Sequence, residues 1–478
     1  MRSPGSLRAA GAGAGAAALA WPSPALGHGI SQRADLPIPE WLFIWAAGLV
    51  LIGSFAALAV LWPRPKLEQR EWRPLPGPLA RVLTARPVEV TCGLAGALLL
   101  VIVIWSGMVG EQVVSANFAP TFVYVLFWVG LVLVSSLFGD VFRAFNPWRA
   151  IGRGFGFLAR HALRGAPPAP LPYPERLGRW PAVAALLAFT WLELASQEAG
   201  GPRGVAFAAL AYSAATFVAM ALYGVEAWIE RGEGFSVYFN LFSRLSPFER
   251  RGDRIGLRRP LSGLADVDAA PGTVALLAVM IGTVTFDGAS EGALWQALVF
   301  PLMGAIEGLG LSPVASVRVA FSIGLVACVV LVYALYRLGA AGVRAAAGGA
   351  KGRPAAGAFI HSLVPIALAY VGAHYLTLVA FQGQAIIYLA SDPLGRGADL
   401  FGTAGRSIDF ALIGANAIWY AQVAFVVLGH VAALMVAHDR ALVLYGHGRA
   451  ATRSQVPMLA VMVAFTTLAL WLLSQANA

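Results

Sequence analysis

Ten apolar stretches alternate with more polar loops along this chain. A helix needs about 20 residues, at roughly 1.5 Å each, to cross the hydrocarbon core of a bilayer, and most of the stretches approach that length. The pattern therefore predicts an all-α membrane protein with about ten transmembrane helices. The stretches are residues 41–62, 88–109, 121–138, 181–196, 205–228, 273–288, 314–338, 358–381, 412–437 and 456–474.

Two segments do not fit a simple crossing. Residues 293–311 are apolar but are interrupted by Pro301, Glu307 and three glycines, which predicts an external re-entrant or interface-lying hairpin. Residues 181–196 are short and carry Glu193 near their outer end, which indicates a helix packed within the bundle.

Charge gives the chain an orientation. Of the 34 Lys and Arg residues, 27 fall in five loops, namely residues 63–87, 139–179, 229–271, 337–354 and 438–455. Cationic loops stay in the cytoplasm during insertion. We therefore expect these five loops inside and both mature termini outside.

Two of the basic loops contain a helix-start signal. Asn146-Pro147 and Ser246-Pro247 each place a capping residue before a proline at the first helical position. The residues after Asn146 separate apolar from basic side chains at helical spacing, which predicts a cytoplasmic interfacial helix on the inner leaflet.

Composition excludes a soluble protein. The chain is 58% hydrophobic and 12% charged, with a mean hydropathy of +0.71, whereas soluble proteins carry about 25% charged residues. The net charge of +10 lies in the cytoplasmic loops, where it faces anionic lipid, so no nucleic-acid partner is implied. Cys92 and Cys328 lie in apolar stretches, which argues against a disulfide framework.

Residues 1–27 have the features of a cleaved signal peptide. A short basic region precedes an Ala/Gly-rich apolar run, and Ala25-Leu26-Gly27 has the small-x-small form of a cleavage site. The mature chain, residues 28–478, would then begin at His28 in the bacterial plasma membrane with its N-terminus exported. An uncut signal anchor, or cleavage one or two residues away, is the alternative.

His374 is the centre of the predicted site, near the outer end of its helix. Its helix leads into an external loop that carries Asp392 and Asp399, and His28 lies on the same side. Such His and carboxylate groups can bind copper or zinc. The alternative is that the aspartates only form turns and pair with nearby arginines. Further polar residues expected around the site are Tyr375, Gln382, Gln384, Asp409 and Arg318.

A second hypothesis concerns His361 and His430 on neighbouring antiparallel stretches. At similar depth they could bind a haem iron or relay a proton. Haem is disfavoured because no second His pair lies at matched depth.

Several motifs together resemble a known family. They are His28-Gly29-Ile30, residues 33–39 (RADLPIP), Phe145-Asn146-Pro147-Trp148, Leu245-Ser246-Pro247-Phe248, His374-Tyr375, residues 381–384 (FQGQ), and Ser391-Asp392-Pro393 to Leu400-Phe401-Gly402. The sequence is similar over nearly its whole length to bacterial multi-pass proteins, frequent in actinobacteria, labelled fenitrothion hydrolase. The resemblance implies metal-assisted hydrolysis of an organophosphate triester and identifies no catalytic residues.

Three functions remain open from the sequence. One is the hydrolase, one is a transporter or metal-handling permease, and one is a non-catalytic scaffold subunit. The first two would bind a hydrophobic small molecule or a metal ion within the bilayer. A transporter requires polar residues that continue through the bundle toward Glu226 or His430, whereas a hydrolase requires polar residues only at the outer side.

Overall fold

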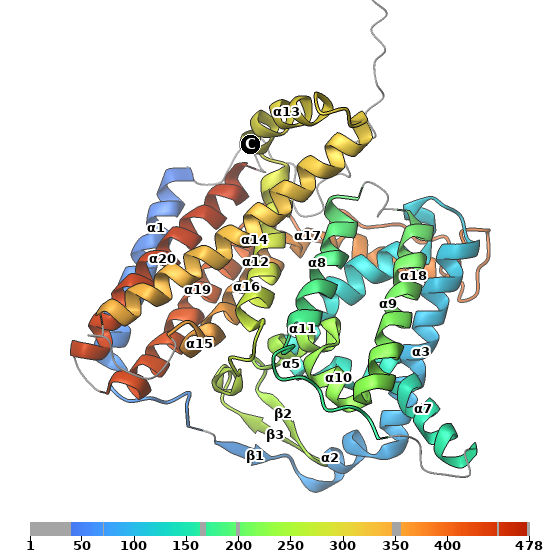
Figure 1. Cartoon of the computed structure of the whole chain (residues 1–478), viewed down its shortest axis with the longest axis horizontal. Helices are drawn as coiled ribbons and strands as arrows, with labels where there is room; N and C mark the ends of the chain where they lie inside the picture. The colour runs from blue at the N-terminus through green and yellow to red at the C-terminus, as the bar shows by residue number, and fades with distance from the viewer. Residues whose placement is uncertain are drawn as a thin grey trace, which may run out of the picture.

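The computed structural model describes residues 40–69, 71–162, 169–196, 201–346, 355–446 and 449–475. The predicted signal peptide and His28 lie outside these residues. The fold is mostly helical, at 76%, with little sheet (Figure 1). This confirms the predicted helical, multi-pass class.

Within the described residues, seven helical segments are long and apolar enough to cross a membrane. They are α3 (Arg86–Val109), the continuous segment Phe118–Phe138, α9 (Pro202–Tyr223), α12 (Thr273–Ser290), α14 (Pro313–Ala346), α19 (Ala415–Tyr445) and α20 over Ala451–Trp471. A bent pair, Ile360–His374 with Leu376–Ser391, raises the number to eight if it forms one span.

The predicted number of ten is not reached by this criterion. Helix α8 (Trp180–Leu194) has 15 residues and extends only about 22 Å, short of the roughly 30 Å hydrocarbon core. Helix α1 (Glu40–Leu61) has 22 residues and contributes the shorter apolar helical segment Trp45–Leu61. Both helices nevertheless lie alongside the longer ones in Figure 1.

The long helices form two groups (Figure 1). In the C-terminal bundle, α1, α12, α14, α19 and α20 (Arg449–Gln475) pack with α16 (Leu363–His374). In the N-terminal bundle, α3 packs on α9, and α8 packs on α11 (Gly234–Ser243). Contacts of α8 with α12 and of α11 with α16 join the two bundles.

The segment Phe118–Phe138 has an unusual centre. Asn117 caps α4 (Phe118–Pro120) by accepting from Ala119 N at 3.0 Å, and a ten-residue π-helix, η2 (Thr121–Gly130), follows before α5 (Leu131–Phe138). Such π-helical segments are rare and occur frequently at functional sites.

A three-stranded antiparallel sheet closes one end of the molecule and was not predicted. Its strands are β1 (Trp72–Pro74), β2 (Phe248–Arg251) and β3 (Arg254–Arg258), in the order β1-β3-β2 with Trp72 opposite Arg258. The sheet unites two of the basic loops. The buried Arg258 anchors it by donating to the carbonyls of Ser243 and Ser246 at 2.9 and 3.0 Å.

The helix expected after Ser246-Pro247 is therefore wrong. Ser246 Oγ accepts from Phe248 N at 3.0 Å but donates to the Leu137 carbonyl at 2.9 Å, so this serine caps a turn against α5. The residues that follow pair with β3 across a tight turn at Gly252, whose φ of +61° suits glycine.

The helix expected after Asn146 is confirmed. Asn146 Oδ1 accepts from Arg149 N at 2.8 Å and caps α7 (Pro147–Ala162). Arg149 bridges Glu89 of α3 and Glu226 at 2.6 and 3.0 Å, while Phe155 on the other face is exposed. The ion pairs thus fix α7 to the end of α3 that lies nearest the sheet.

Helix α11 lies inside the predicted loop 229–271 but is buried along most of its length. Glu233, fully buried, caps it by accepting from Phe235 N and Ser236 N at 3.0 and 2.8 Å. The same carboxylate accepts from Asn146 at 3.1 Å and from Tyr212.

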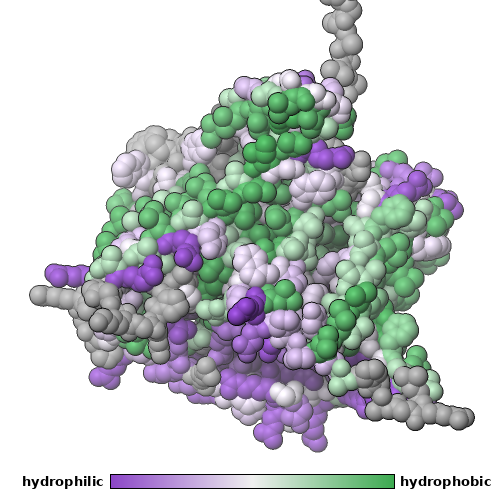
Figure 2. Space-filling model, viewed as in Figure 1, coloured by the Kyte–Doolittle hydropathy of each residue, from purple (hydrophilic) through white to green (hydrophobic). Residues whose placement is uncertain are grey.

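The two ends of the molecule differ in polarity. Hydrophilic side chains gather at the end that carries the sheet, here called the sheet end, and apolar side chains cover the flanks of the helices (Figure 2). At the opposite end, here called the hairpin end, α13 (Ala293–Glu307) packs on α14 and lies across the bundle (Figure 1).

Shorter elements are α2 (Gly77–Thr84), η1 (Val114–Ala116), α6 (Val141–Phe145), α10 (Val225–Arg231), η3 (Ser262–Asp266), α15 (Ala355–Ala358), η4 (Ile360–Ser362), α17 (Leu376–Ala380), η5 (Gln382–Ala385) and α18 (Ile386–Ser391).

Candidate functional site

The candidate site forms where the α16–α17 segment breaks. Helix α16 ends at His374, and the two halves of the pair meet at an angle of 57°. The buried Gln422 of α19 donates to the Ala373 carbonyl at 2.9 Å, so a side chain satisfies a backbone group at the break. Broken helices at membrane depth are tolerated where such partners are present.

Three side chains meet at this break. His374 Nε2 lies 2.9 Å from Oδ2 of Asp287, and the Tyr375 hydroxyl donates to the same oxygen at 2.8 Å. Asp287 comes from the last turn of α12, and its side chain is only 11% exposed, against 12% for His374. The pair is therefore almost entirely removed from solvent.

Two features of the surroundings of the His374 ring are electrostatic. The ring faces a carboxylate, and His374 is the last residue of α16, where the helix dipole stabilises cations. On the other side of the ring, a Cβ placed on Gly288 would lie 3.5 Å from Nδ1, so the neighbouring turn of α12 also lines the site.

Two further carboxyl groups interact electrostatically with this pair. Glu291, exposed just beyond α12, interacts with both Asp287 and His374. Glu193 of α8 interacts with Asp287 and Tyr375, and its Oε2 is buried with no hydrogen-bond partner among the residues that the structure describes. The acidic groups thus extend from the exposed hairpin end into the interior.

Polar groups continue from Glu193 toward the sheet end. The Glu193 carboxyl interacts with Tyr238 of α11, whose ring stacks on Trp128 at 4.7 Å. Farther along α11, Asn240 donates to Asp140 at 2.8 Å. The sequence analysis associated a transporter with polar residues that continue toward Glu226 or His430, whereas these groups lie along α11.

Asp392 and Asp399 form hydrogen bonds within their own loop. Asp392 accepts from the backbone of Arg396 and Gly397 at 3.0 and 2.6 Å, and Asp399 accepts from Ala404 N at 3.0 Å. The loop is held to the α3 end of the N-terminal bundle, because the carbonyl of Leu394 accepts from Glu111 N. The turn-forming alternative therefore describes these contacts, and the hydrogen bonds of His374 go to Asp287.

The other predicted residues separate into two groups. Tyr375 belongs to the group formed by Asp287, His374 and Tyr375, here called the Asp287 cluster. Gln384 instead pairs with the backbone of Asp409, accepting from its nitrogen at 3.0 Å and donating to its carbonyl at 3.1 Å. Gln382 is exposed in η5, and Arg318 lies near the start of α14.

His361 and His430 are both buried but lie at different levels. His361 hydrogen-bonds to the backbone of Val436, which is six residues, or roughly 9 Å, along α19 from His430. His430 Nδ1 instead pairs with the Val426 carbonyl at 2.7 Å, beside the Tyr370 ring.

Asp287 is the residue that the sequence analysis did not assign. Its signal was a carboxylate within three residues of the outer end of an apolar stretch. Residue depth alone could not show that α12 and α16 are neighbours.

Comparison of the chain with protein-family models, with curated proteins and with solved structures gives no match. Among the described residues there is also no group of three or more His, Cys, Asp or Glu side chains arranged to hold a metal ion. The site is therefore interpreted from its own geometry.

Proposed function

We propose that this chain is a secondary transporter of the bacterial plasma membrane that binds a proton at the Asp287–His374 pair. The observation that carries the proposal is the burial of this pair at a break between two helices. Ionisable residues within a membrane are costly and usually serve transport or proton relay, and transporters build their sites at interrupted helices.

The charge distribution supplies a direction. By the positive-inside rule the basic sheet end faces the cytoplasm, which places both mature termini and the hairpin end outside. Glu291 then receives protons from the external solution and passes them to the Asp287–His374 pair. Glu193 and Tyr238 continue the route inward.

Inverted membrane vesicles test the proposal. Respiration acidifies their interior, and a permeant dye such as acridine orange reports the gradient. Addition of a transported compound from a panel of lipophilic amines and uncharged aromatics should release protons from vesicles that contain the wild-type chain. Asp287→Asn and His374→Ala should abolish that release, because each removes one half of the proton-binding pair.

The exposed turn residue Asp253 offers a matched control, and Asp253→Asn should behave as wild type. Proton release that is undiminished in both Asp287→Asn and His374→Ala would contradict the proposal.

The hydrolase implied by the resemblance is a separate prediction with its own assay. Purified protein that releases a nitrophenol from fenitrothion, with turnover lost in His374→Ala, would favour the enzyme over the transporter. Stoichiometric copper or zinc in wild-type protein, lost in the same variant, would support the metal site predicted from the sequence.

A further inference from the structure

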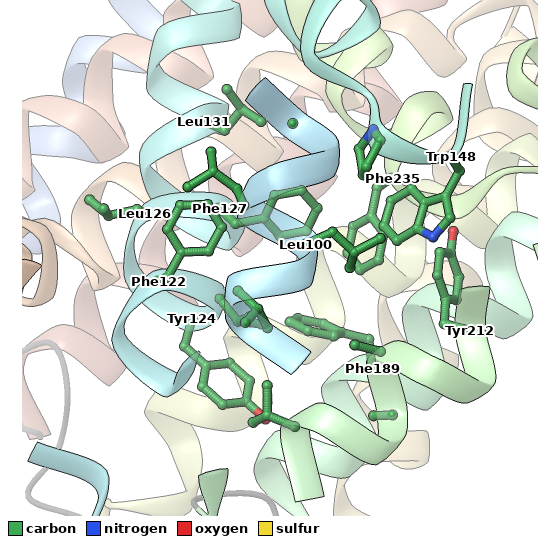
Figure 3. Close-up of a pocket in the computed structure, with 18 of the residues that line it drawn as sticks. Leu100, Phe122, Tyr124, Leu126, Phe127, Leu131, Trp148, Phe189, Tyr212 and Phe235 are labelled. Carbon is green, nitrogen blue, oxygen red and sulfur yellow. The ribbon is translucent and has the colours of Figure 1, made fainter. Parts of the chain in front are cut away.

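A cavity of about 670 Å³ lies in the N-terminal bundle, separate from the Asp287 cluster. Its walls come mainly from α3, η2, α6, α7, α8, α9 and α11 and are apolar, with aromatic rings among them such as those of Phe122, Phe127, Phe189 and Phe235 in Figure 3. The volume falls within the range of about 300–1,000 Å³ that is typical of small-molecule sites.

Three polar side chains of the lining direct their donors away from the cavity into other hydrogen bonds. Trp148 Nε1 donates to Ser213 at 2.9 Å, Trp191 Nε1 donates to Ser322 at 2.7 Å, and the Tyr212 hydroxyl donates to Glu233. None of these three acceptors lines the cavity. A charged molecule would lose its hydration there without compensation, so the lining selects an uncharged one.

Two exposed lining residues indicate that the cavity opens between α8 and α9. These helices pack mainly on other elements, α9 on α3 and α8 on α11 and α12. Ala188 of α8 and Ala211 of α9 both line the cavity and are both exposed, so small side chains stand at this opening. Because the flanks of these helices are apolar, a lipophilic molecule can enter directly from the bilayer.

We propose that this cavity binds an uncharged, lipophilic molecule that contains aromatic rings and enters laterally from the membrane. Flat rings suit walls that offer edge-to-face and offset contacts. Tyr124 lines the cavity and interacts electrostatically with Glu193, which places the bound molecule beside the acidic groups of the proton site. That this molecule is the transported substrate rests on the function proposed above, whereas its binding does not.

Two probes with the same rings and different charge test the binding. N-phenyl-1-naphthylamine is uncharged, and 8-anilinonaphthalene-1-sulfonate adds a sulfonate. Energy transfer from tryptophan to each probe is measured on the protein in lipid nanodiscs, with empty nanodiscs subtracted. The uncharged probe should bind saturably at one site per chain, and the sulfonate should neither bind there nor compete.

Filling the cavity should remove this binding. Ala209→Phe on α9 and Ala188→Phe on α8 each add a ring to the walls formed by two different helices, and each should lower the affinity for the uncharged probe at least about tenfold, because a filled cavity cannot accept the ligand without strain. Ala214→Phe and Ala184→Phe are matched controls on exposed positions of the same helices that do not line the cavity, and they should bind as wild type. The use of two walls guards against one variant failing to fold.

Three results would overturn the inference. They are unchanged binding in both filled variants, equal binding of the sulfonate at the same site, and only non-saturable uptake because bilayer acyl chains occupy the space. Asp287→Asn should leave probe binding intact. Absence of saturable probe binding to the wild-type protein, with its proton release intact, would therefore remove this inference alone, whereas saturable binding without proton release would remove only the proposed function.

Discussion

Asp287 joins two residues from either side of a helix break through one carboxylate oxygen, and this sharing gives the site its rigidity. His374 and Tyr375 are adjacent in sequence, yet both direct their polar atoms to Oδ2 at 2.9 and 2.8 Å. The ring of His374 is fixed in orientation on one side by this contact and on the other by the turn at Gly288. A proton bound at this pair is consequently held at a defined position within the bundle.

Removal of one donor should weaken the fold measurably. Tyr375→Phe deletes the hydroxyl but keeps the ring, and the loss of a hydrogen bond to a buried carboxylate should cost about 1–3 kcal/mol. Thermal unfolding in detergent should therefore give a lower Tm. Tyr420→Phe, at an exposed position of α19, should leave the Tm unchanged. Equal Tm values for wild type and Tyr375→Phe would argue against the contact.

Glu233 gives a prediction about pH, since it caps α11 outside the candidate membrane spans. Burial raises the pKa of the Glu233 carboxyl, and hydrogen bonds from Ser236 and Tyr212 offset only part of this rise. The folded chain then holds this proton more tightly than the unfolded chain, in which glutamate titrates at about 4.3. The stabilisation is complete below the unfolded pKa and is lost as the pH rises through the folded pKa.

The Tm advantage of wild type over Glu233→Gln should consequently shrink as the pH is raised from about 4 to 8. Measurement of the Tm of both proteins across this range checks the sign. The exposed Glu230 supplies the control, because Glu230→Gln should show no comparable trend. An advantage that grows with pH would mean that the surrounding donors favour the carboxylate more strongly than burial opposes it.

Glycines allow α3 to pack closely against its neighbours in the N-terminal bundle. A Cβ on Gly107 would lie 2.5 Å from the Pro202 carbonyl oxygen of α9, and one on Gly96 would lie 1.8 Å from the Phe145 carbonyl oxygen. Small residues let the backbones of membrane helices approach in this way. The cavity wall formed by α3 and α9 depends on that approach.

Gly107→Ala should therefore destabilise the bundle by about 1–3 kcal/mol, because the added methyl meets backbone that cannot rotate away. Gly48→Ala in α1, where nothing lies within 4 Å, provides the comparison and should leave stability unchanged or raise it by up to about 1 kcal/mol through helix propensity. Unfolding curves of the two variants in the same detergent decide the matter. Indistinguishable curves would show that α3 and α9 can separate without loss.

At the scale of the whole molecule, features that depend on local composition could be predicted from the sequence, whereas contacts between distant segments could not. The long spans follow from uninterrupted apolar residues, and α7 follows from the Asn146 cap. The sheet could not be predicted, because β1 and β3 come from basic loops some 180 residues apart and their register depends on the folded chain. The partnership of His374 with Asp287 was missed for the same reason, since it depends on how α12 and α16 pack.

The orientation of the molecule is the last prediction, and it follows from the distribution of Lys and Arg. If the basic sheet end is cytoplasmic, Asp253 in the β2–β3 turn faces inward, while Leu309, exposed between α13 and α14, faces outward. In a chain in which Cys92 and Cys328 are replaced by Ala, Leu309→Cys should react with a membrane-impermeant maleimide added to intact cells. Asp253→Cys should react only after the cells are opened. Labelling of Asp253→Cys in intact cells would invert the orientation, and Glu291 would then open toward the cytoplasm and receive protons from there.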